Sequence, residues 1–278
     1  MISIRDFHFS YGKTPVFAGV STTLTEGHIY GILGKNGTGK STLLYNIAGL
    51  LYPRQGRISV NGKDPSKRHP EFLQDIFMVP EEFYLPNISI RAFVKCYSPF
   101  YPKFDRDAFA HHLSLFDVPI ESKLQGMSYG QRKKVYIAFG VASNVSVLLM
   151  DEPTNGLDII SKNQLRKVMA GAATDERIFL ISSHQVKDLE NLIDEVLILD
   201  GTAIVLKENL NHIAKKLAFR ISFNEDDLRE ALYAESVLKG NTIVTRNKDN
   251  GESHVDLELL YKATMADPAR MRTALTSN

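Results

Sequence analysis

Residues 34–41 carry the chemistry of a phosphate-binding loop. Their sequence, Gly-Lys-Asn-Gly-Thr-Gly-Lys-Ser, is a complete G-x-x-x-x-G-K-[ST] pattern. Its three glycines let the backbone fold around an anion and point N–H groups inward. Lys40 would reach the β- and γ-phosphates of a nucleoside triphosphate, and Ser41 would hold Mg²⁺. The residues predicted to contact the nucleotide in this segment are Gly34, Lys35, Asn36, Gly37, Thr38, Gly39, Lys40, Ser41 and Thr42.

Two carboxylates follow an apolar stretch farther along the chain. Val147–Met150 runs directly into Asp151 and Glu152. A hydrolase of phosphoanhydrides would place such a pair opposite its phosphate loop, where Asp151 can hold Mg²⁺ through water and Glu152 can deprotonate the attacking water. Taken alone, an Asp-Glu pair at the end of a strand is more often a solvated strand end than a site.

The elements that must position these residues are short apolar runs and amphipathic segments. His28–Leu33 is expected to form a strand before the loop, and Ser41–Leu50 to start a helix whose positive end faces the anion. The other apolar runs of strand length are Val147–Met150, Ile178–Ile181 and Val196–Leu199, and the helical patterns between them include Lys162–Gly171 and Val186–Leu192. This alternation predicts a buried parallel sheet and an α/β core.

Three further segments surround this core. Ile2–Phe9 and Arg57–Val60, the latter followed by the turn sequence Asn61-Gly62, predict an antiparallel β flank. Residues from about 83 to 140 are rich in Phe and Tyr and then in helix-forming residues, which predicts a mostly helical insert. Asp200-Gly201 has the composition of a hairpin turn, and we expect the main domain to cover residues 1–210.

Residues 211–278 are expected to form a small α+β accessory domain. Leu217–Phe223 and Thr242–Thr245 are strand-like, whereas Asp226–Leu238 and Val255–Met265 have helical spacing. The segment Asn247–Ser253 has the composition of a turn.

Composition limits the class of partner and compartment. The 278 residues include 33 Lys and Arg and 32 Asp and Glu, so the formal charge of +1 argues against a nucleic-acid partner. Cys96 is the only cysteine, which excludes an intrachain disulfide and fits a reducing compartment. The longest apolar-leaning stretch, Val135–Met150, is too short for a membrane span. We expect a cytoplasmic protein.

Four further segments of the sequence contain motifs. Leu124–Lys133 reads Leu-Gln-Gly-Met-Ser-Tyr-Gly-Gln-Arg-Lys and lies about 20 residues before Asp151. Ser182-Ser183-His184 follows an apolar strand, Asn155–Asp158 follows the acidic pair, and Tyr11 lies in Phe9-Ser10-Tyr11-Gly12. Together with the phosphate loop, these segments resemble the signature, switch histidine, D-loop and adenine-stacking aromatic residue of ATP-binding subunits of ABC transporters.

The resemblance covers about residues 2–206 and implies a P-loop NTPase core with ATP and Mg²⁺ as ligands. It also implies a head-to-tail dimer of two copies that drives a separate transmembrane permease, so that the chain would sit on the inner face of the membrane. The catalytic residues it implies are Lys40, Glu152 and His184. The metal ligands are Ser41, Asp151 and Glu81. The remaining nucleotide contacts are Tyr11, Ser128, Gly130, Gln131 and Asp158, with Asp158 coupling the two sites.

Two positions depart from the family pattern. Glu81 stands where the family usually has glutamine, and it would add a negative charge beside the triphosphate; Glu82 is adjacent and could be the matching residue. Tyr129 replaces the first of two signature glycines, while Ser128 and Gly130 remain. ATP hydrolysis is still expected, with a strict need for Mg²⁺.

The aromatic insert allows two interpretations. Its side chains could fill the core of a helical subdomain, or they could receive a cytoplasmic helix of the permease, for which Phe83, Tyr84 and Tyr101 are the best candidates. The segment Asp256–Tyr261 loosely resembles the accessory segment of exporter-type subunits, which favours export. The alternatives are a soluble ABC-family ATPase that acts on ribosomes or DNA, and a nucleotide-gated binding module with little turnover.

Overall fold

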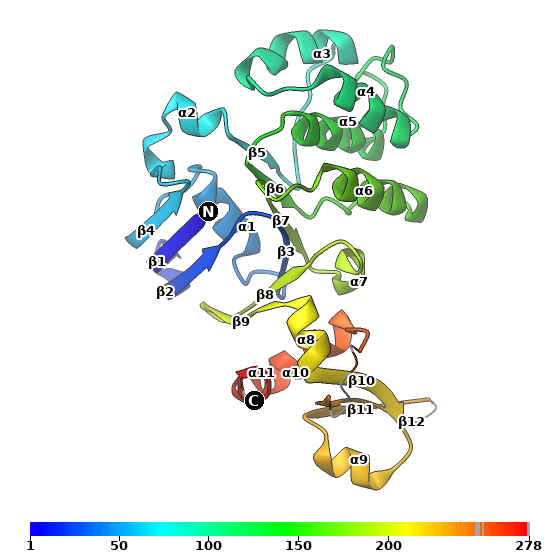
Figure 1. Ribbon diagram of the computed structural model, residues 1–278. Helices are drawn as coiled ribbons and strands as arrows, with labels where there is room; N and C mark the ends of the chain where they lie inside the picture. Colours follow the sequence, from blue (N-terminus) through cyan, green and yellow to red (C-terminus); the bar gives the residue numbers. More distant parts are fainter. Residues whose placement is uncertain (239, 248–250, 252, 277–278) are drawn as a thin grey trace.

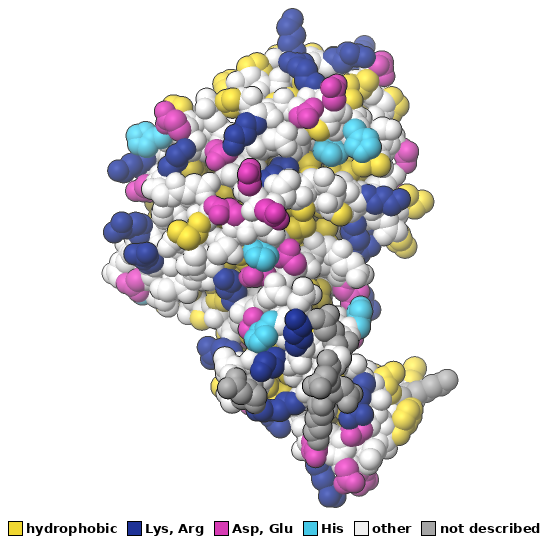
Figure 2. All heavy atoms as spheres, in the orientation of Figure 1, with side chains coloured by type: hydrophobic (Ala, Val, Ile, Leu, Met, Phe, Trp, Pro, Cys, Tyr) yellow, Lys and Arg dark blue, Asp and Glu magenta, His cyan; other side chains and the backbone are white. Residues whose placement is uncertain are grey.

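The computed structural model describes residues 1–278 except 239, 248–250, 252, 277 and 278. Figure 1 shows a larger lobe that contains the N-terminus and a smaller lobe that follows it in the sequence. Figure 2 shows that a narrower waist joins the two lobes and that acidic and basic side chains are interspersed on the face in view.

A six-stranded sheet forms the centre of the larger lobe. Its strand order is β5 (Ile76–Val79), β6 (Val147–Asp151), β7 (Ile178–Ser183), β3 (His28–Leu33), β8 (Glu195–Asp200) and β9 (Ala203–Asn209). The first five strands are parallel, and β9 pairs antiparallel with β8 across the hairpin at Asp200-Gly201. All residues of β6 and β7 are buried, as in a sheet covered on both faces. The predicted α/β core is therefore confirmed.

The two faces of the sheet pack against different elements. Leu149 and Leu180 belong to a core shared with α1 (Lys40–Ile47) and the antiparallel flank. Leu148 and Phe179, one residue away along the same strands, belong to a core shared with α6 (Ile159–Ala172) and the insert. This division follows from the alternation of side chains along a strand.

The flank is a three-stranded antiparallel sheet in the order β2-β1-β4. The strands are β1 (Ile2–Tyr11), β2 (Thr14–Leu24) and β4 (Gln55–Val60). The turn at Asn61-Gly62 is present, and Val60 pairs with Lys63 across it. A 3₁₀ turn (Pro65–Lys67) and α2 (Pro70–Leu73) lead from the flank to β5. The predicted flank is confirmed, with β2 as an additional strand.

The insert is mostly helical, as predicted. It contains α3 (Ile90–Tyr97), a 3₁₀ turn (Ser98–Phe100), α4 (Arg106–Leu115) and α5 (Tyr129–Ala142). The ring of Phe139 lies 4.8 to 5.9 Å, centroid to centroid, from the rings of Phe93, Tyr101 and Phe104. Many of the insert's aromatic residues therefore form its core.

In its described residues, the smaller lobe combines the helices α8 to α11 with a sheet of order β10-β12-β11. Its elements are α8 (Leu210–Lys216), β10 (Leu217–Ser222), α9 (Glu225–Glu230), β11 (Tyr233–Val237), β12 (Gly240–Arg246), α10 (Leu257–Ala266) and α11 (Pro268–Thr276). The strands predicted at 217–223 and 242–245 and the helix predicted at 255–265 are confirmed. The turn predicted over Asn247–Ser253 lies partly outside the described residues.

The helix predicted over Asp226–Leu238 is wrong in its second half. Helix α9 begins at the side-chain cap of Asn224 and ends where Ala231 adopts an extended backbone, with ψ 136°. The following residues pair antiparallel with β12, Tyr233 opposite Val244 and Val237 opposite Gly240. Pairing with a strand later in the sequence overrides the local helical spacing.

The two lobes have separate sheets but share apolar contacts. Leu206 in β9, Ile213 in α8 and Leu260 in α10 belong to the same buried cluster as the α6 face of the central sheet. Nζ of Lys187 in the larger lobe lies 3.4 Å from Oε2 of Glu258 in the smaller lobe. The domain boundary at residue 210 stays a prediction. Among the described residues, no helix has the length and apolar composition that a bilayer crossing requires.

Candidate functional site

The phosphate-binding loop connects β3 to α1. Gly37 and Gly39 have φ of 84° and 94°, a left-handed backbone that favours glycine. A Cβ at Gly39 would also lie 2.5 Å from Cγ1 of Val16 and 2.9 Å from the ring of Phe17. Gly39 is the N-cap residue of α1. Because glycine has no side chain, it offers the first N–H groups of this helix no side-chain acceptor.

Lys40 is buried at the start of α1. Its Nζ donates hydrogen bonds to the carbonyls of Gly34, at 2.9 Å, and Lys35, at 3.3 Å. It lies 3.9 Å from Oε1 of Glu152. Burial lowers the pKa of Lys40, and the nearby carboxylates of Glu152, Asp151 and Glu81 act against this effect. The loop therefore holds a cation next to the acidic pair.

Asp151 and Glu152 lie at the carboxyl end of β6, beside the end of β7. Oδ1 of Asp151 accepts a hydrogen bond of 2.5 Å from the hydroxyl of Ser182. Glu152 has φ 47° and its N–H donates to the carbonyl of Ser182 at 3.2 Å. Oε2 of Glu152 lies 2.9 Å from Nδ1 of His184, and burial raises the pKa of Glu152 despite this contact. A carboxyl group in this environment is suited to accept a proton from water.

A cavity of about 530 Å³ joins these groups. Its lining residues are Tyr11, Thr14, Val16, Asn36, Gly37, Gly39, Lys40, Ser41, Thr42, Glu81, Glu152 and His184. Glu81 rather than Glu82 is among them. The hydroxyl of Tyr11 lies 3.4 Å from Oγ1 of Thr42, and the Tyr11 side chain is half exposed at the rim. The size and the mixture of cation, glycine backbone and acid suit a nucleoside triphosphate.

The structure does not bring every predicted residue to this cavity. Gly34, Lys35 and Thr38 belong to the phosphate loop but do not line the cavity, and Thr38 donates its hydroxyl to the carbonyl of Lys35 at 2.9 Å. Asp151 is buried beside Ser182 and does not line the cavity. The signature residues Ser128, Gly130 and Gln131, together with Asp158, also lie outside it.

The signature residues form the exposed start of α5. Oγ of Ser128 accepts from the N–H of Gln131 at 3.2 Å, and the Gln131 side chain accepts from the N–H of Ser128 at 3.0 Å, which is a capping box. A Cβ at Gly130 would lie 2.8 Å from the carbonyl of Gly156. Asp158 caps α6 by accepting from the N–H of Ser161 at 2.7 Å, and this bond lowers the pKa of Asp158.

The sequence analysis missed two groups. Thr14 and Val16 of β2 line the cavity, but no motif marks them. Lys133 is completely buried and donates to the carbonyls of Glu152, at 2.8 Å, and Asn155, at 3.0 Å. A lysine four residues after Tyr129, on the same face of a helix, was the only available signal.

The residues present fit a nucleotide-bound Mg²⁺ better than an ion held by protein alone. Among the described residues, no three His, Cys, Asp or Glu side chains gather as a metal site. Ser41 lies at the start of α1, directly after the phosphate loop, and Asp151 lies at the carboxyl end of β6, which is separated from β3 by β7. Mg²⁺ is usually bound by one or two protein oxygens together with phosphates and water. The hydroxyl of Ser41 and the carboxylate of Asp151 fit this type of coordination.

Comparisons with known proteins agree with this site. A family model described as "ABC transporter" matches residues 17–155. The ABC transporter ATP-binding protein NatA of Bacillus subtilis is 30% identical in an alignment of 202 residues that covers 70% of this chain and 82% of NatA. The ABC transporter ATP-binding protein YtrB of the same organism is 26% identical in an alignment of 230 residues that covers 81% of this chain and 78% of YtrB.

One solved structure extends the comparison to the fold. It is a dimeric post-hydrolysis state of the ATP-binding cassette MJ0796 bound to ADP and Pi, with a TM-score of 0.66 and 20% identity, covering 75% of this chain and 98% of that chain. At this identity the likeness shows the fold alone. Fold, motifs and relatives together identify the chain as a member of the ABC transporter family, an ATP-binding subunit and ATPase with a P-loop NTPase core.

Proposed function

We propose that this chain hydrolyses ATP as one half of a head-to-tail dimer and that the dimer drives a separate membrane permease. The observation that carries the proposal is the division of the motif residues into two groups. Lys40, Glu152 and His184 line one cavity. Ser128 and Asp158 cap helices outside it. A site that needs both groups is completed when the signature of a second copy faces the phosphate loop of the first.

Each residue of the cavity has a chemical role in this proposal. Glu152 is the general base, and its raised pKa brings it closer to the range in which a base is effective. His184, 2.9 Å from Glu152, orients it and senses the γ-phosphate. Lys40 stabilises charge on the β- and γ-phosphates. The phosphates are cradled by residues 34–42, and Tyr11 stacks on the adenine.

Mg²⁺ is held in this proposal by Ser41, Asp151 and Glu81, where it would neutralise phosphate charge. Glu81 lines the cavity and its Oε1 accepts a hydrogen bond of 2.9 Å from Asn155. This carboxylate lies near Lys40 along with Asp151 and Glu152, so three acids surround the site of a polyphosphate. We therefore expect turnover to depend steeply on the divalent cation.

The dimer gives the hydrolysis cycle a mechanical output. Ser128, Gly130 and Gln131 of one copy would bind the γ-phosphate held by the other, so ATP favours the closed pair. Loss of the γ-phosphate removes these contacts, and the pair reopens. The MJ0796 cassette, which shares this fold, is dimeric with ADP and Pi bound, and we take this as support for a dimer.

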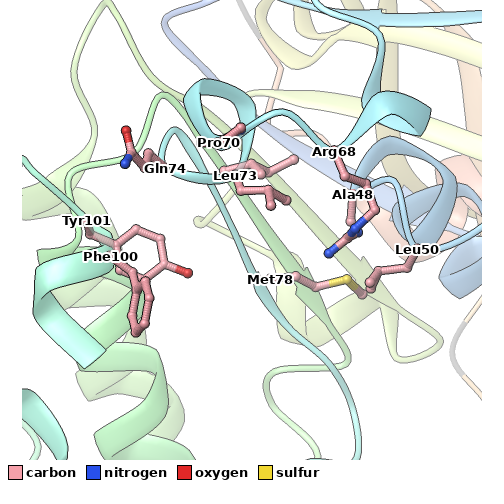
Figure 3. A pocket seen from close by; sticks show the side chains of 10 residues that line it. Ala48, Leu50, Arg68, Pro70, Leu73, Gln74, Met78, Phe100 and Tyr101 are labelled. Atoms are coloured by element: carbon pink, nitrogen blue, oxygen red, sulfur yellow. The ribbon is translucent and has the colours of Figure 1, made fainter. Parts of the chain in front are cut away.

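The permease is proposed to dock in a groove between the insert and the core. A cavity of about 440 Å³ has Phe100 and Tyr101 on one side and Leu50 and Met78 on the other, with Leu73 between them (Figure 3). Phe100 is 65% and Leu50 51% exposed, so large apolar side chains are open to a partner. A short amphipathic helix on a cytoplasmic loop of the permease is the occupant we propose.

The three aromatic candidates differ in their fitness for this role. Tyr101 lines the groove, and Tyr84 is 78% exposed. Phe83 stacks on Tyr136 at 5.1 Å between ring centroids and contributes mainly to packing. The proposed location is the cytoplasmic face of the membrane, and the proposed direction is export. Support for export comes from residues 256–261, where Asp256 caps α10 as the exporter-like segment begins.

Turnover and assembly test the proposal together. ATP hydrolysis by the purified chain is measured with Mg²⁺ beside a Glu152→Gln variant, and light scattering follows the oligomeric state. We expect the parent to turn over ATP and the variant to stop and accumulate as an ATP-bound dimer. If both bind ATP but neither hydrolyses it nor dimerises, the head-to-tail cycle is wrong for the isolated chain and the nucleotide-gated binding module is favoured.

A further inference from the structure

Tyr129, at the position where the family has glycine, joins the signature to another part of the chain. Its hydroxyl donates a hydrogen bond to the main-chain carbonyl of Glu81. Its ring lies 5.4 Å from that of Phe83, centroid to centroid. A Cβ at Gly156 would lie 3.0 Å from Cδ1 of Tyr129. The first turn of α5 is therefore attached to the segment after β5 and rests against the loop after β6.

Lys133 attaches the same helix to the loop that carries Glu152. It lies one turn after Tyr129, and its Nζ is 5.4 Å from the centroid of the Tyr129 ring. The ammonium donates to the carbonyls of Glu152 and Asn155 at 2.8 and 3.0 Å. A buried ammonium persists only where such acceptors surround it, so these two bonds fix the loop after β6 against α5.

Asn155 connects Lys133 to Glu81. Its Nδ2 donates a hydrogen bond to Oε1 of Glu81 at 2.9 Å, and the main-chain carbonyl of Glu81 accepts the hydrogen bond from Tyr129. Tyr129, Glu81, Asn155 and Lys133 thus form a closed set of contacts, here called the Tyr129 network. It links three segments: the signature turn, the Glu81 segment and the loop after Glu152.

The network also balances charge near the nucleotide cavity. Burial lowers the pKa of Lys133 to about 8, and the carboxylates of Glu81, Glu152 and Asp151 act against this effect. The three carboxylates that influence Lys133 are those that we place around the nucleotide. The ammonium therefore offsets negative charge at the position where a polyphosphate would add more.

We propose that Tyr129 and Lys133 are positioning residues for ATP hydrolysis, which fix the signature turn against Glu152 through the Tyr129 network. This inference rests on the proposed function, in which Ser128 serves the ATP of the partner and Glu152 serves the ATP of its own chain. The network then couples the two sites of the dimer within each copy. Tyr129 gives this chain a contact that glycine at the same position cannot make.

A Tyr129→Phe variant tests the coupling without relying on turnover. Phenylalanine keeps the aromatic ring and removes only the hydroxyl, which binds at Glu81. We expect faster deuterium exchange in residues 80–84 and also in residues 152–157, where the hydroxyl makes no hydrogen bond. A Tyr97→Phe variant, which removes a hydroxyl from α3 outside the network, should change neither segment. Faster exchange in 80–84 alone, or no change, would overturn the proposal.

Kinetics provide the second measurement. With the same variants, Tyr129→Phe should lower kcat about fivefold while KM stays within about twofold, because one positioning hydrogen bond is lost and the nucleotide contacts remain. An unchanged kcat would count against the proposal. If the parent itself does not hydrolyse ATP, the proposed function fails, and the exchange experiment alone decides whether the network couples the segments.

Lys133→Met approaches the network from its other side. This variant keeps an apolar side chain of similar length but leaves two carbonyls without their donor. We expect faster exchange both in residues 152–157 and in the Glu81 segment at 80–84, to which the ammonium makes no hydrogen bond. Exchange that rises only in residues 152–157 would contradict the coupling. Should this variant fail to fold, Tyr129→Phe still gives the decisive result.

Discussion

The nucleotide cavity and the signature face of this ATPase differ in how fully their own chain supports them. The side chains of Lys40 and Glu152 are 7% and 6% exposed, and they contact each other, the phosphate loop and His184. Ser128 and Asp158 are exposed, and their side chains accept hydrogen bonds that cap their own helices. Two isoleucines beside Asp158 point into solvent. Contacts within the chain therefore position the side chains of the nucleotide cavity. The signature face instead exposes polar and apolar side chains, which in the proposed dimer would contact the second copy.

The largest expected effect is the loss of Lys40. A Lys40→Ala variant should lose about 100-fold or more in turnover, because a preorganised cation no longer faces the phosphates. Nucleotide binding, followed by fluorescence titration, should weaken in the same variant. Lys95→Ala is the matched control, because it removes an exposed lysine from α3, and Lys95 does not line the nucleotide cavity. Equal losses in the two variants would contradict the assignment of Lys40.

Mixing two inactive variants tests whether the nucleotide cavity and the signature face meet within one chain or between two chains. Lys40→Ala and Ser128→Ala should each be inactive alone. Mixed one to one, they should recover about a quarter of the parent rate, because half of the dimers are mixed and each mixed dimer has one intact site. Ser128→Ala should still bind nucleotide in its own cavity. Activity that does not return on mixing would place both groups in one chain or show that each dimer needs two intact sites, and Glu152→Gln mixed with Ser128→Ala would repeat the test.

Much of the cavity was predictable because its motifs are local. The loop at 34–41 is contiguous, and strand and helix patterns around it placed β3, α1 and β6 correctly. The end of a parallel strand that follows such a pattern lies at the same edge of the sheet as the loop, so Glu152 and Lys40 were expected to meet. Their approach to 3.9 Å agrees with this expectation.

The signature face was less predictable because its contacts join distant segments. Nothing in the sequence near Tyr129 announces a bond to Glu81, 48 residues earlier. Lys133 sits in a helical pattern that would suit a solvated lysine, yet it is buried against a loop about 20 residues later. Pairing between distant segments also explains why the second half of the helix predicted over Asp226–Leu238 is wrong, because β11 pairs with β12 there.

Acid should weaken the insert that carries the signature. His112 in α4 is buried, and Nδ1 has no hydrogen-bond partner in the described part of the chain. Burial, with the charges of His111 and Arg177, lowers the pKa of His112 to about 4. Folding therefore favours the neutral ring, so stability is present above pH 6.5 and is lost as the pH falls from there toward 4.

The size of this effect follows from the shift in pKa. Between pH 7 and pH 5 the parent should lose about 2 kcal/mol in its free energy of unfolding through this one group. Urea denaturation at both pH values, for the parent and for His112→Leu, measures the difference. The variant should lose less stability on acidification than the parent. Equal losses would mean that the ring is protonated without penalty in the folded state.

The smallest expected effect concerns the apolar part of the signature face. Ile159 and Ile160 are 81% and 70% exposed next to Asp158. In the proposed dimer they lie where the second copy approaches, so partial burial of the two Ile159 side chains, one from each copy, should together contribute about tenfold to dimer affinity. Ile159→Ser in a Glu152→Gln background should raise the ATP-dependent dimer dissociation constant by that factor, as measured by light scattering over a concentration series.

The matched control for this prediction lies in the smaller lobe. Ile221 in β10 is 58% exposed, so Ile221→Ser removes a similar apolar surface far from Asp158 along the chain. The two variants should be equally stable as monomers, because neither side chain is part of a core. If only Ile159→Ser weakens the dimer, the exposed isoleucines belong to the surface that completes the ATP site. If both variants dimerise like the parent, the second copy does not contact Ile159. The exposed face around Asp158 would then be a surface for a partner other than a second copy of this chain.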